Sequence, residues 1–179
     1  GNYTTGYSCR KIAYRNQTAT CQFQSHVTDV ILKHVRKLRE GMTYIILEKN
    51  VWTTFVNIGP HLEFWRMTTE PVRRFYLYET ATGRVLFSFS PPEQQELLAE
   101  ENGDPGIYWS RYADESEQIR RHGFCMFLRA RYRTFSYSVP VFDMDGKLAG
   151  ALGVYTLPEH VTPRKTRLIL AHLNAAAKE

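Results

Sequence analysis

Residues 80–83, Thr-Ala-Thr-Gly, are the part of this sequence best suited to bind a ligand. The apolar residues that follow, beginning with Val85, indicate a short helix whose N-terminus lies near Thr80. The first backbone N–H groups of a helix have no partner within it and lie at the positive end of its dipole, so this point suits a carboxylate. The small side chains of Ala81 and Gly83 would let a ligand approach. An ordinary helix start packed under a loop has the same sequence, so that alternative stays open.

The cysteines and histidines show no pattern typical of a catalytic or metal site. Three cysteines, Cys9, Cys21 and Cys125, are an odd number without metal-ligand spacing. The six histidines form no i, i+4 pair with a glutamate partner. Cys125 follows His122 by three residues, but a helix end and the strand after it do not reliably bring two side chains together. We therefore interpret Cys125 as a buried structural residue and predict no catalytic centre, no metal and no cofactor.

The composition indicates one globular domain. Of 179 residues, 43% are apolar and 13% aromatic, which is enough for one substantial core and too little for two ordinary domains. No apolar run reaches the roughly 18 residues needed to cross a bilayer, and the first residues lack the features of a signal peptide. Because the cysteines also suggest no disulfide framework, we expect a protein of the reducing cytoplasm without a membrane partner.

The net charge of +5 is spread along the chain rather than gathered in a tail. Basic residues do cluster within the helix predicted over residues 26–40. Such a run is usually a solvated helix face, and no aromatic residues alternate with it to stack on nucleic-acid bases. We therefore expect no direct contact between this chain and nucleic acid.

The order of the predicted elements indicates an α+β domain around an antiparallel sheet. Helical spacing, capping residues and terminal glycines predict helices over residues 26–40, 80–89, 90–101, 114–122 and from Thr162 onward. Stretches rich in β-branched and aromatic residues predict strands over residues 42–48, 51–58, 62–67, 124–129, 134–142 and 147–155. The last two strands are joined at Met144-Asp145-Gly146, a strong hairpin signal. Residues 1–25 have no sustained period and are expected to form a connector to the domain over 26–179.

Three segments, in order, resemble the effector-binding domains of IclR-type bacterial transcription regulators. The segment YETATGRVLF at 78–87 is similar to the family's TAxG signature with its following basic and apolar residues. The segment IRRHGF at 119–124 resembles an IRxxG element, and YSVPVFDMDGKLAGALGV at 137–154 resembles the PVFDxxG element and the strand after it. The resemblance covers roughly residues 27–177. It implies a GAF-like fold, in which a curved antiparallel sheet of five or six strands holds a small molecule.

The resemblance also implies a pocket. It assigns the backbone amides of Ala81 and Thr82 to the acidic end of an effector, and it places Ser136, Gly153 and Tyr155 where the family contacts its ligand. Alternation along the last strand puts Gly153 and Tyr155 on the same face, so that a hydroxyl reaches in beside an open space. We therefore expect a small carboxylic acid as the effector.

Three further positions match pocket positions of the family. Phe127 stands where an acidic residue is usual, which would remove an acceptor for effector hydroxyls, add an aromatic wall, and make the site less suited to polyhydroxylated ligands. Met67 and Phe75 match apolar positions on the covering side. Each of the three side chains has an alternative role in ordinary core packing.

The resemblance implies a sensor rather than an enzyme. We expect effector binding to bias the arrangement of a homodimer or homotetramer, and thereby DNA binding by a winged helix-turn-helix domain that precedes this region in the family and is not part of this sequence. The alternative is a GAF-like or PAS-like sensor of a different signalling protein. A small hydrolase would need a nucleophile, a base and an oxyanion site, and no motif assembles them.

Overall fold

The computed structural model describes residues 7–48, 51–60, 77–130 and 133–179. These residues form an α+β domain with a five-stranded antiparallel sheet in the order β2-β1-β5-β4-β3. The strands are β1 (Gly41–Glu48), β2 (Val51–Ile58), β3 (Cys125–Arg129), β4 (Thr134–Phe142) and β5 (Leu148–Thr156). The predicted fold class is confirmed, while the strand predicted over 62–67 lies outside the described residues.

Local sequence signals account for two antiparallel hairpins. Strands β1 and β2 pair from Met42 opposite Ile58 to Glu48 opposite Val51. Strands β4 and β5 pair across a turn in which the amide of Gly146, at a positive φ of 76°, donates to the carbonyl of Asp143. The Asp-Gly pair supplies the left-handed backbone that this turn needs, so the predicted hairpin is confirmed.

The middle of the sheet depends on contacts between distant parts of the chain. Strand β1 pairs with β5, with Thr43 opposite Gly153, and so joins the first hairpin to the second. Strand β3 pairs only with β4 among the described strands, and therefore lies at one edge of the sheet. This arrangement places residues more than a hundred positions apart in the sequence side by side.

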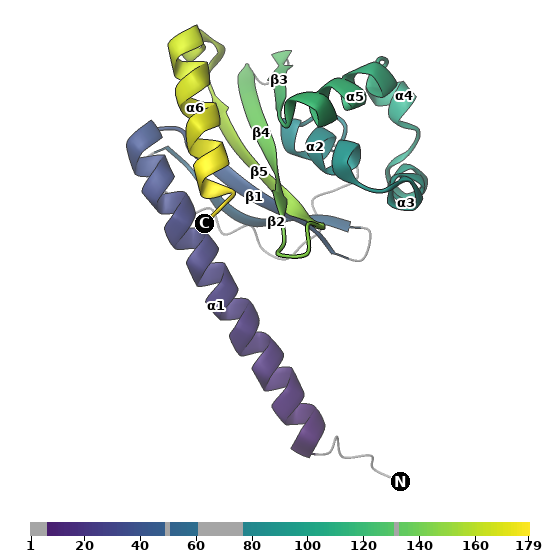
Figure 1. The fold of residues 1–179 in the computed structure, drawn as a ribbon, viewed down its shortest axis with the longest axis vertical. Helices are drawn as coiled ribbons and strands as arrows, with labels where there is room; N and C mark the ends of the chain where they lie inside the picture. The colour runs from purple at the N-terminus through teal and green to yellow at the C-terminus, as the bar shows by residue number, and fades with distance from the viewer. Residues whose placement is uncertain (1–6, 49–50, 61–76, 131–132) are drawn as a thin grey trace.

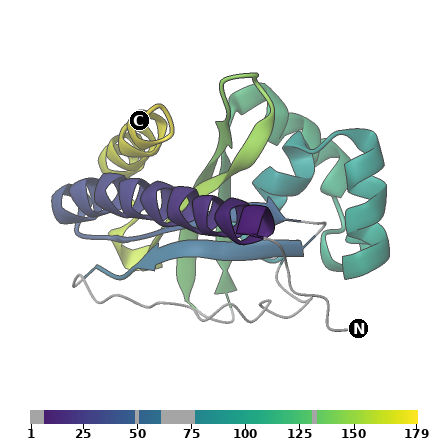
Figure 2. The ribbon, with the colours of Figure 1, turned by 90° about the horizontal axis from the view of Figure 1, so that it is seen from below.

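The helices divide between the two faces of the sheet (Figures 1 and 2). Helices α1 (Tyr7–Leu38) and α6 (Pro163–Ala176) lie together on one face, while α2 (Ala81–Phe89) packs on the other and is covered by α5 (Tyr112–His122). The remaining helical elements are α3 (Pro92–Asn102), α4 (Pro105–Tyr108) and a 3-10 turn, η2 (Pro158–His160). None of the helices in the described part of the chain has the length and apolar composition needed to cross a membrane.

Each face has an apolar cluster. Under α1 and α6, the fully buried side chains include Ile31, Tyr137 and Ile169, each with 0% of its surface exposed. Under α2 and α5, the buried cluster includes Val85 and Leu86 of α2. Alternation along the strands divides the sheet residues between the two clusters.

Helix α1 is longer than predicted. It begins at Tyr7 rather than near residue 26, and it ends at Leu38, where Arg39 takes a positive φ of 55°. Figure 1 shows that its first half extends beyond the sheet. Since residues 7–25 carry no sustained apolar period, the sequence pattern gave no sign of a helix that continues past the packed face.

The caps of the remaining helices follow the sequence closely, with one difference. Thr162 caps α6 by accepting from the amide of Lys165 at 3.1 Å, and Gly123 ends α5 in a left-handed conformation. In contrast, α3 begins after Pro91 without a side-chain cap, because the Ser90 hydroxyl donates to the carbonyl of Leu86 at 2.7 Å instead. Ser90 therefore belongs to the end of α2.

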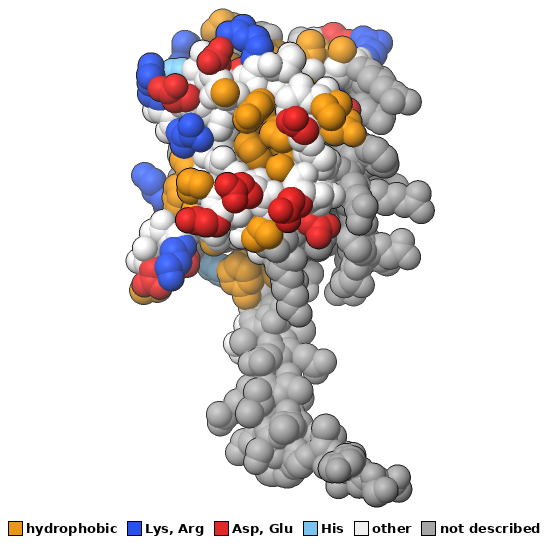
Figure 3. Space-filling model, turned by 90° about the vertical axis from the view of Figure 1, so that its right-hand side faces the viewer, with side chains coloured by type: hydrophobic (Ala, Val, Ile, Leu, Met, Phe, Trp, Pro, Cys, Tyr) orange, Lys and Arg blue, Asp and Glu red, His pale blue; other side chains and the backbone are white. Residues whose placement is uncertain are grey.

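The surface over α3 to α5 mixes apolar and acidic side chains (Figure 3). Leu97 and Ile107 are exposed there, at 39% and 75%. The sequence from Pro91 to Ser110 carries five acidic residues and no lysine or arginine, namely Glu93, Glu96, Glu100, Glu101 and Asp104. The positive net charge of the chain therefore resides elsewhere.

Candidate functional site

The first turn of α2 has the geometry of an anion-binding helix end. Thr80 is the N-cap, and its hydroxyl accepts from the amide of Gly83 at 3.0 Å. The amides of Ala81 and Thr82 make no hydrogen bond to any other described residue. Two backbone donors at the positive end of the helix are therefore available.

A cavity of about 380 Å³ lies beside this helix end. Helix α2 and its cap contribute Thr80 and Thr82, and the remaining lining comes from all five strands. The strand residues are Thr43, Ile45, Thr54, Asn57, Arg129, Thr134, Ser136, Tyr137, Gly153, Val154 and Tyr155. We call this space the α2 cavity. Its volume falls within the range of small-molecule sites.

The structure brings together four of the eight residues predicted for the pocket: Thr82, Ser136, Gly153 and Tyr155 all line the α2 cavity. Ser136 pairs with Tyr155 across β4 and β5, which puts both side chains on one face of the sheet. Ala81 is buried beside the cavity, at 1% exposure, and its side chain is not part of the lining. The structure therefore does not place Ala81 among the residues that line the cavity.

The missing side chains of Gly83 and Gly153 allow neighbouring parts of the protein to pack closely. A Cβ at Gly153 would lie 2.6 Å from the methyl group of Thr82, so the missing side chain lets α2 approach the sheet. A Cβ at Gly83 would lie 1.8 Å from the carbonyl oxygen of Leu77. Gly83 therefore serves close packing of the helix start on the preceding backbone, rather than the approach of a ligand.

The wall of the α2 cavity is more apolar than polar, but polar groups are placed on several sides of it. Threonine and serine hydroxyls come from four elements, and Arg129 supplies a guanidinium group. The Tyr155 hydroxyl donates to Oδ1 of Asn57 at 3.3 Å, and burial raises the pKa of Tyr155 above its usual value. The phenol is therefore protonated at neutral pH and remains a donor. Such a wall offers hydrogen bonds on several sides of one bound molecule.

Several of these lining residues were not among the predicted site residues. Thr43, Thr54 and Asn57 belong to the first hairpin, and Arg129 and Thr134 face each other at the junction of β3 and β4. Alternation along the predicted strands would have grouped Thr43 with Ile45 on one face. Which face looks toward α2, however, depends on the pairing of β1 with β5.

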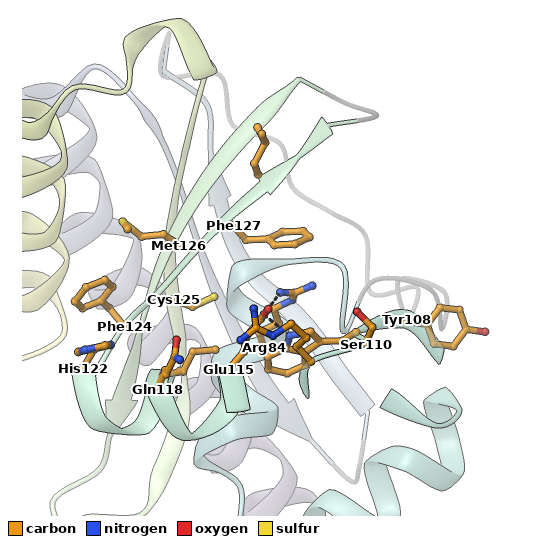
Figure 4. Close-up of a pocket in the computed structure, with 14 residues that line it drawn as sticks. Arg84, Tyr108, Ser110, Glu115, Gln118, His122, Phe124, Cys125, Met126 and Phe127 are labelled. Carbon is orange, nitrogen blue, oxygen red and sulfur yellow. Dashed lines mark hydrogen bonds and ion pairs between the residues drawn. The ribbon is translucent and has the colours of Figure 1, made fainter. Parts of the chain in front are cut away.

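Phe127 lies next to this group without lining the α2 cavity. It pairs with Ser136 across β3 and β4, so the two side chains share a face of the sheet. The Phe127 ring contacts the guanidinium of Arg84, whose Cζ is 3.9 Å from the ring centroid, and it lines a second cavity, on the α5 side of α2. Figure 4 shows Phe127 in that cavity with Arg84, Glu115 and Cys125. Met67 and Phe75 lie outside the described residues.

Within the described residues, no three histidine, cysteine or acidic side chains are arranged to hold a metal ion. Cys125 is buried, and burial raises the pKa of its thiol to about 12, which disfavours the thiolate that nucleophilic chemistry requires.

Comparison with known proteins identifies the family. Residues 26–179 match the model of the bacterial transcriptional regulator IclR C-terminal domain. No curated protein sequence matches the chain.

Solved structures share the fold at low sequence identity. An ICLR transcriptional regulator from Silicibacter sp. TM1040 is 20% identical, with a TM-score of 0.71, over 98% of this chain and 71% of that chain. The C-terminal domain of E. coli KdgR is 18% identical, with a TM-score of 0.64, over 85% of this chain and 94% of that chain. A double mutant of the PobR inducer-binding domain from Acinetobacter, in complex with 3-hydroxybenzoic acid, is 17% identical, with a TM-score of 0.63, over 86% of this chain and 96% of that chain.

Proposed function

The chain belongs to the family of the IclR C-terminal domain of bacterial transcriptional regulators, and we propose that it senses a small, polar carboxylic acid, which binds in the α2 cavity. One observation carries this proposal: the amides of Ala81 and Thr82 have no partner among the described residues, and Thr82 lines a cavity whose wall also carries hydroxyl groups. A carboxylate is the ligand group that a helix N-terminus favours, and hydroxyls orient the rest of the molecule.

The effector class follows from the wall of the cavity. Most of that wall is apolar, and hydroxyl groups such as those of Ser136 and Tyr155 are set into it. Arg129 adds a positive charge that also favours an acid. A carboxylate with an apolar body and a hydroxyl group therefore fits this wall. The solved PobR domain, which has the same fold, was bound to 3-hydroxybenzoic acid, a ligand of this chemical type.

Effector binding would act through population shift. A ligand that holds the α2 end against β5 stabilises the domain conformation in which the two are close. Helix α1 packs on the opposite face of the same sheet and extends beyond it, so it is suited to transmit the change to an attached DNA-binding domain in a homodimer or homotetramer. In this proposal the chain acts in the bacterial cytoplasm, catalyses no reaction, and contacts DNA only through the attached domain. Family membership argues against a sensor from an unrelated signalling protein.

Calorimetric titration with 3-hydroxybenzoate and other hydroxylated carboxylates tests the proposal. We expect saturable binding to the wild-type protein and on the order of 10-fold weaker binding by Thr82→Pro, because proline removes one of the two amide donors. Proline is tolerated in the first turn of a helix, so the variant should fold.

A pair of tyrosine variants provides the matched control. Tyr155→Phe removes a hydroxyl from the cavity wall, whereas Tyr112→Phe removes one from α5, outside that lining. The first should weaken binding of a ligand identified in the titration several-fold, and the second should leave it unchanged. If Thr82→Pro and Tyr155→Phe both folded and bound that ligand as the wild type does, the effector site would lie elsewhere.

A further inference from the structure

The second cavity, of about 590 Å³, lies between α5 and the edge strand β3 and is lined by charged and aromatic side chains (Figure 4). Its charged residues include Arg84, Arg111 and Glu115. Its aromatic residues are Tyr108, Trp109, Phe124 and Phe127. We call it the Arg84 cavity, because that side chain lies at its centre.

Arg84 is held in one fixed orientation. Its Nε donates to the carbonyl of Tyr78 at 2.8 Å, and its Nη1 donates to Oε2 of Glu115 at 2.9 Å. The guanidinium lies between two rings, with its Cζ 4.5 Å from the Trp109 centroid and 3.9 Å from the Phe127 centroid. Both faces of the guanidinium plane are therefore covered, and only its edges are open to further contacts.

One edge of this guanidinium has no partner. Arg84 is only 8% exposed, yet Nη2 makes no hydrogen bond to any other described residue. Burial of the guanidinium, which disfavours its charged form, lowers the pKa of Arg84, and the charges of Cys125 and Glu115 act in the opposite direction. Nη2 is not one of the fully buried atoms without a partner, so it reaches the cavity, and its two N–H donors are available to an acceptor there.

The charge and shape of the cavity determine the class of that acceptor. Two arginines line it against one glutamate, and Glu115 is already engaged by both Arg84 and the indole N–H of Trp109. The remaining wall includes four aromatic residues among apolar and uncharged polar ones, and such aromatic side chains suit a planar ring. A carboxylate is the acceptor whose geometry matches an arginine edge.

We propose that the Arg84 cavity is a second ligand site, which binds a small aromatic carboxylate with its carboxyl group against Nη2 of Arg84. The site is separate from the α2 cavity. Cys125, Phe127 and Arg129 follow one another on the same face of β3, and Cys125 and Phe127 line the Arg84 cavity while Arg129 lines the α2 cavity. The proposal therefore does not rest on the effector site, and each can fail without the other.

Trp109 provides a local probe. Its indole N–H donates to Glu115 inside the cavity, so the indole signal in a ¹H–¹⁵N NMR spectrum, assigned with Trp109→Phe, reports on this site. We expect titration with benzoate to shift this signal saturably. Benzyl alcohol, which has the ring but no charge, should produce no saturable shift or bind at least 10-fold more weakly. Equal binding of the two probes would overturn the assignment to Arg84, and no shift with benzoate would overturn the site.

Variants separate the two cavities. Thr54→Phe fills part of the α2 cavity from β2, the strand at the other edge of the sheet, and should leave the Trp109 response to benzoate unchanged. Arg84→Met should weaken benzoate binding on the order of 10- to 100-fold. If Thr54→Phe abolished the Trp109 response, the signal would reflect the α2 cavity, and the second site would be overturned.

Exposed positions test the site even if Arg84→Met does not fold. Gln118 is exposed on α5 and lines the cavity, so Gln118→Trp should block benzoate without disturbing the core. Arg111→Glu reverses a charge in the lining, and Arg121→Glu makes the same change on α5 outside the lining. The first should weaken benzoate binding several-fold and the second should not. Equal affinities for benzoate in the wild type, Gln118→Trp and Arg111→Glu would overturn the proposal.

Discussion

The same strands carry different kinds of side chain on the two faces of the sheet. Along β4, Tyr137 and Val139 point under α1 and α6, where both are at most 1% exposed. Their neighbour Ser136 points to the other face and lines the α2 cavity. Along β5, Val154 is buried in the first cluster, while Gly153 and Tyr155 line the cavity.

Under the proposed function, this difference places most of the stability and the binding of ligands on different faces. Under α1 and α6 many large side chains are fully buried, so loss of one of them leaves a void, and the cavity at this face is smaller, at about 120 Å³. The α2 face has two larger cavities, one with small and polar residues of the strands in its lining and one lined by charged and aromatic side chains. Open space contributes no packing energy, and therefore the packed face must supply the stability that the binding face lacks. Substitutions on the two faces should differ accordingly.

The largest expected effect is on the packed face. Tyr137→Ala should lower the free energy of unfolding by about 3–5 kcal/mol, because it removes a fully buried ring and the bond from its hydroxyl to Thr166. Ser136→Ala, one residue away, should change it by less than about 0.5 kcal/mol. Urea unfolding of the two variants gives the comparison. Similar losses in both would show that the faces contribute equally to stability.

A smaller loss is expected where α2 starts. Gly83→Ala places a methyl group against the carbonyl oxygen of Leu77 and should lower the free energy of unfolding by about 1–3 kcal/mol. Gly146→Ala, a change at a positive-φ turn with open space around it, provides a control for backbone strain alone and should cost about 1 kcal/mol. Thermal unfolding of both variants measures the difference, and a stability of Gly83→Ala equal to the wild type would contradict close packing at Leu77.

Hydrogen bonds on the binding face should contribute less. Tyr155→Phe removes the bond to Asn57 and should lower the free energy of unfolding by about 0.5–1 kcal/mol. The same substitution is expected to weaken effector binding, so its effect on function should exceed its effect on stability. If Tyr155→Phe lowered the free energy of unfolding more than Gly83→Ala does, the main role of Tyr155 would be structural.

The smallest effect concerns pH at the contact between α1 and α6. His172 packs against His34, with the two Nδ1 atoms 2.8 Å apart, and its pKa is lowered by burial and by the charges of His34 and Lys37. Because the pKa is lower in the folded protein, the unfolded chain binds more protons as the pH falls below about 6.5, and stability decreases.

Unfolding at pH 7.5 and pH 5.5 checks this direction. The wild type should be less stable at the lower pH, and His172→Gln should reduce that difference. His122→Gln, on α5 away from this contact, is the matched control and should behave as the wild type. If the pH difference were the same in His172→Gln, the helix contact would not titrate in this range.

Local signals in the sequence predicted a large part of this fold. The Asp145-Gly146 turn, the Gly123 helix end and the Thr162 cap each depend on residues within a few positions, and all three are confirmed. The start of α2 near Thr80 is confirmed in the same way. These features depend on backbone conformations and short-range hydrogen bonds that particular residue types favour. They can therefore be predicted from a single sequence.

The patterns in the sequence did not predict the contacts between distant segments of the chain. Alternation shows that Phe127 and Arg129 share a face of β3, but not that Phe127 lies over Arg84 in a cavity apart from Arg129. Likewise, the pairing of β1 with β5 decides that Thr43 faces Gly153. Strands of similar hydrophobicity can pair in several orders within a sheet. The alternation of side chains along each strand is the same in every order, so it does not determine which strands pair.

The sequence by itself determined most of the elements, their approximate ends apart from the start of α1, the beginning of a helix at Thr80, and, through the resemblance, the IclR-type family. Only the tertiary structure decided which side chains meet at that helix start and which form the separate Arg84 cavity. The physical reason is how far apart in the sequence the interacting residues are. Caps, turns and periodicity are set by neighbours in the chain, whereas a cavity is the space left between elements that close packing brings together from distant segments.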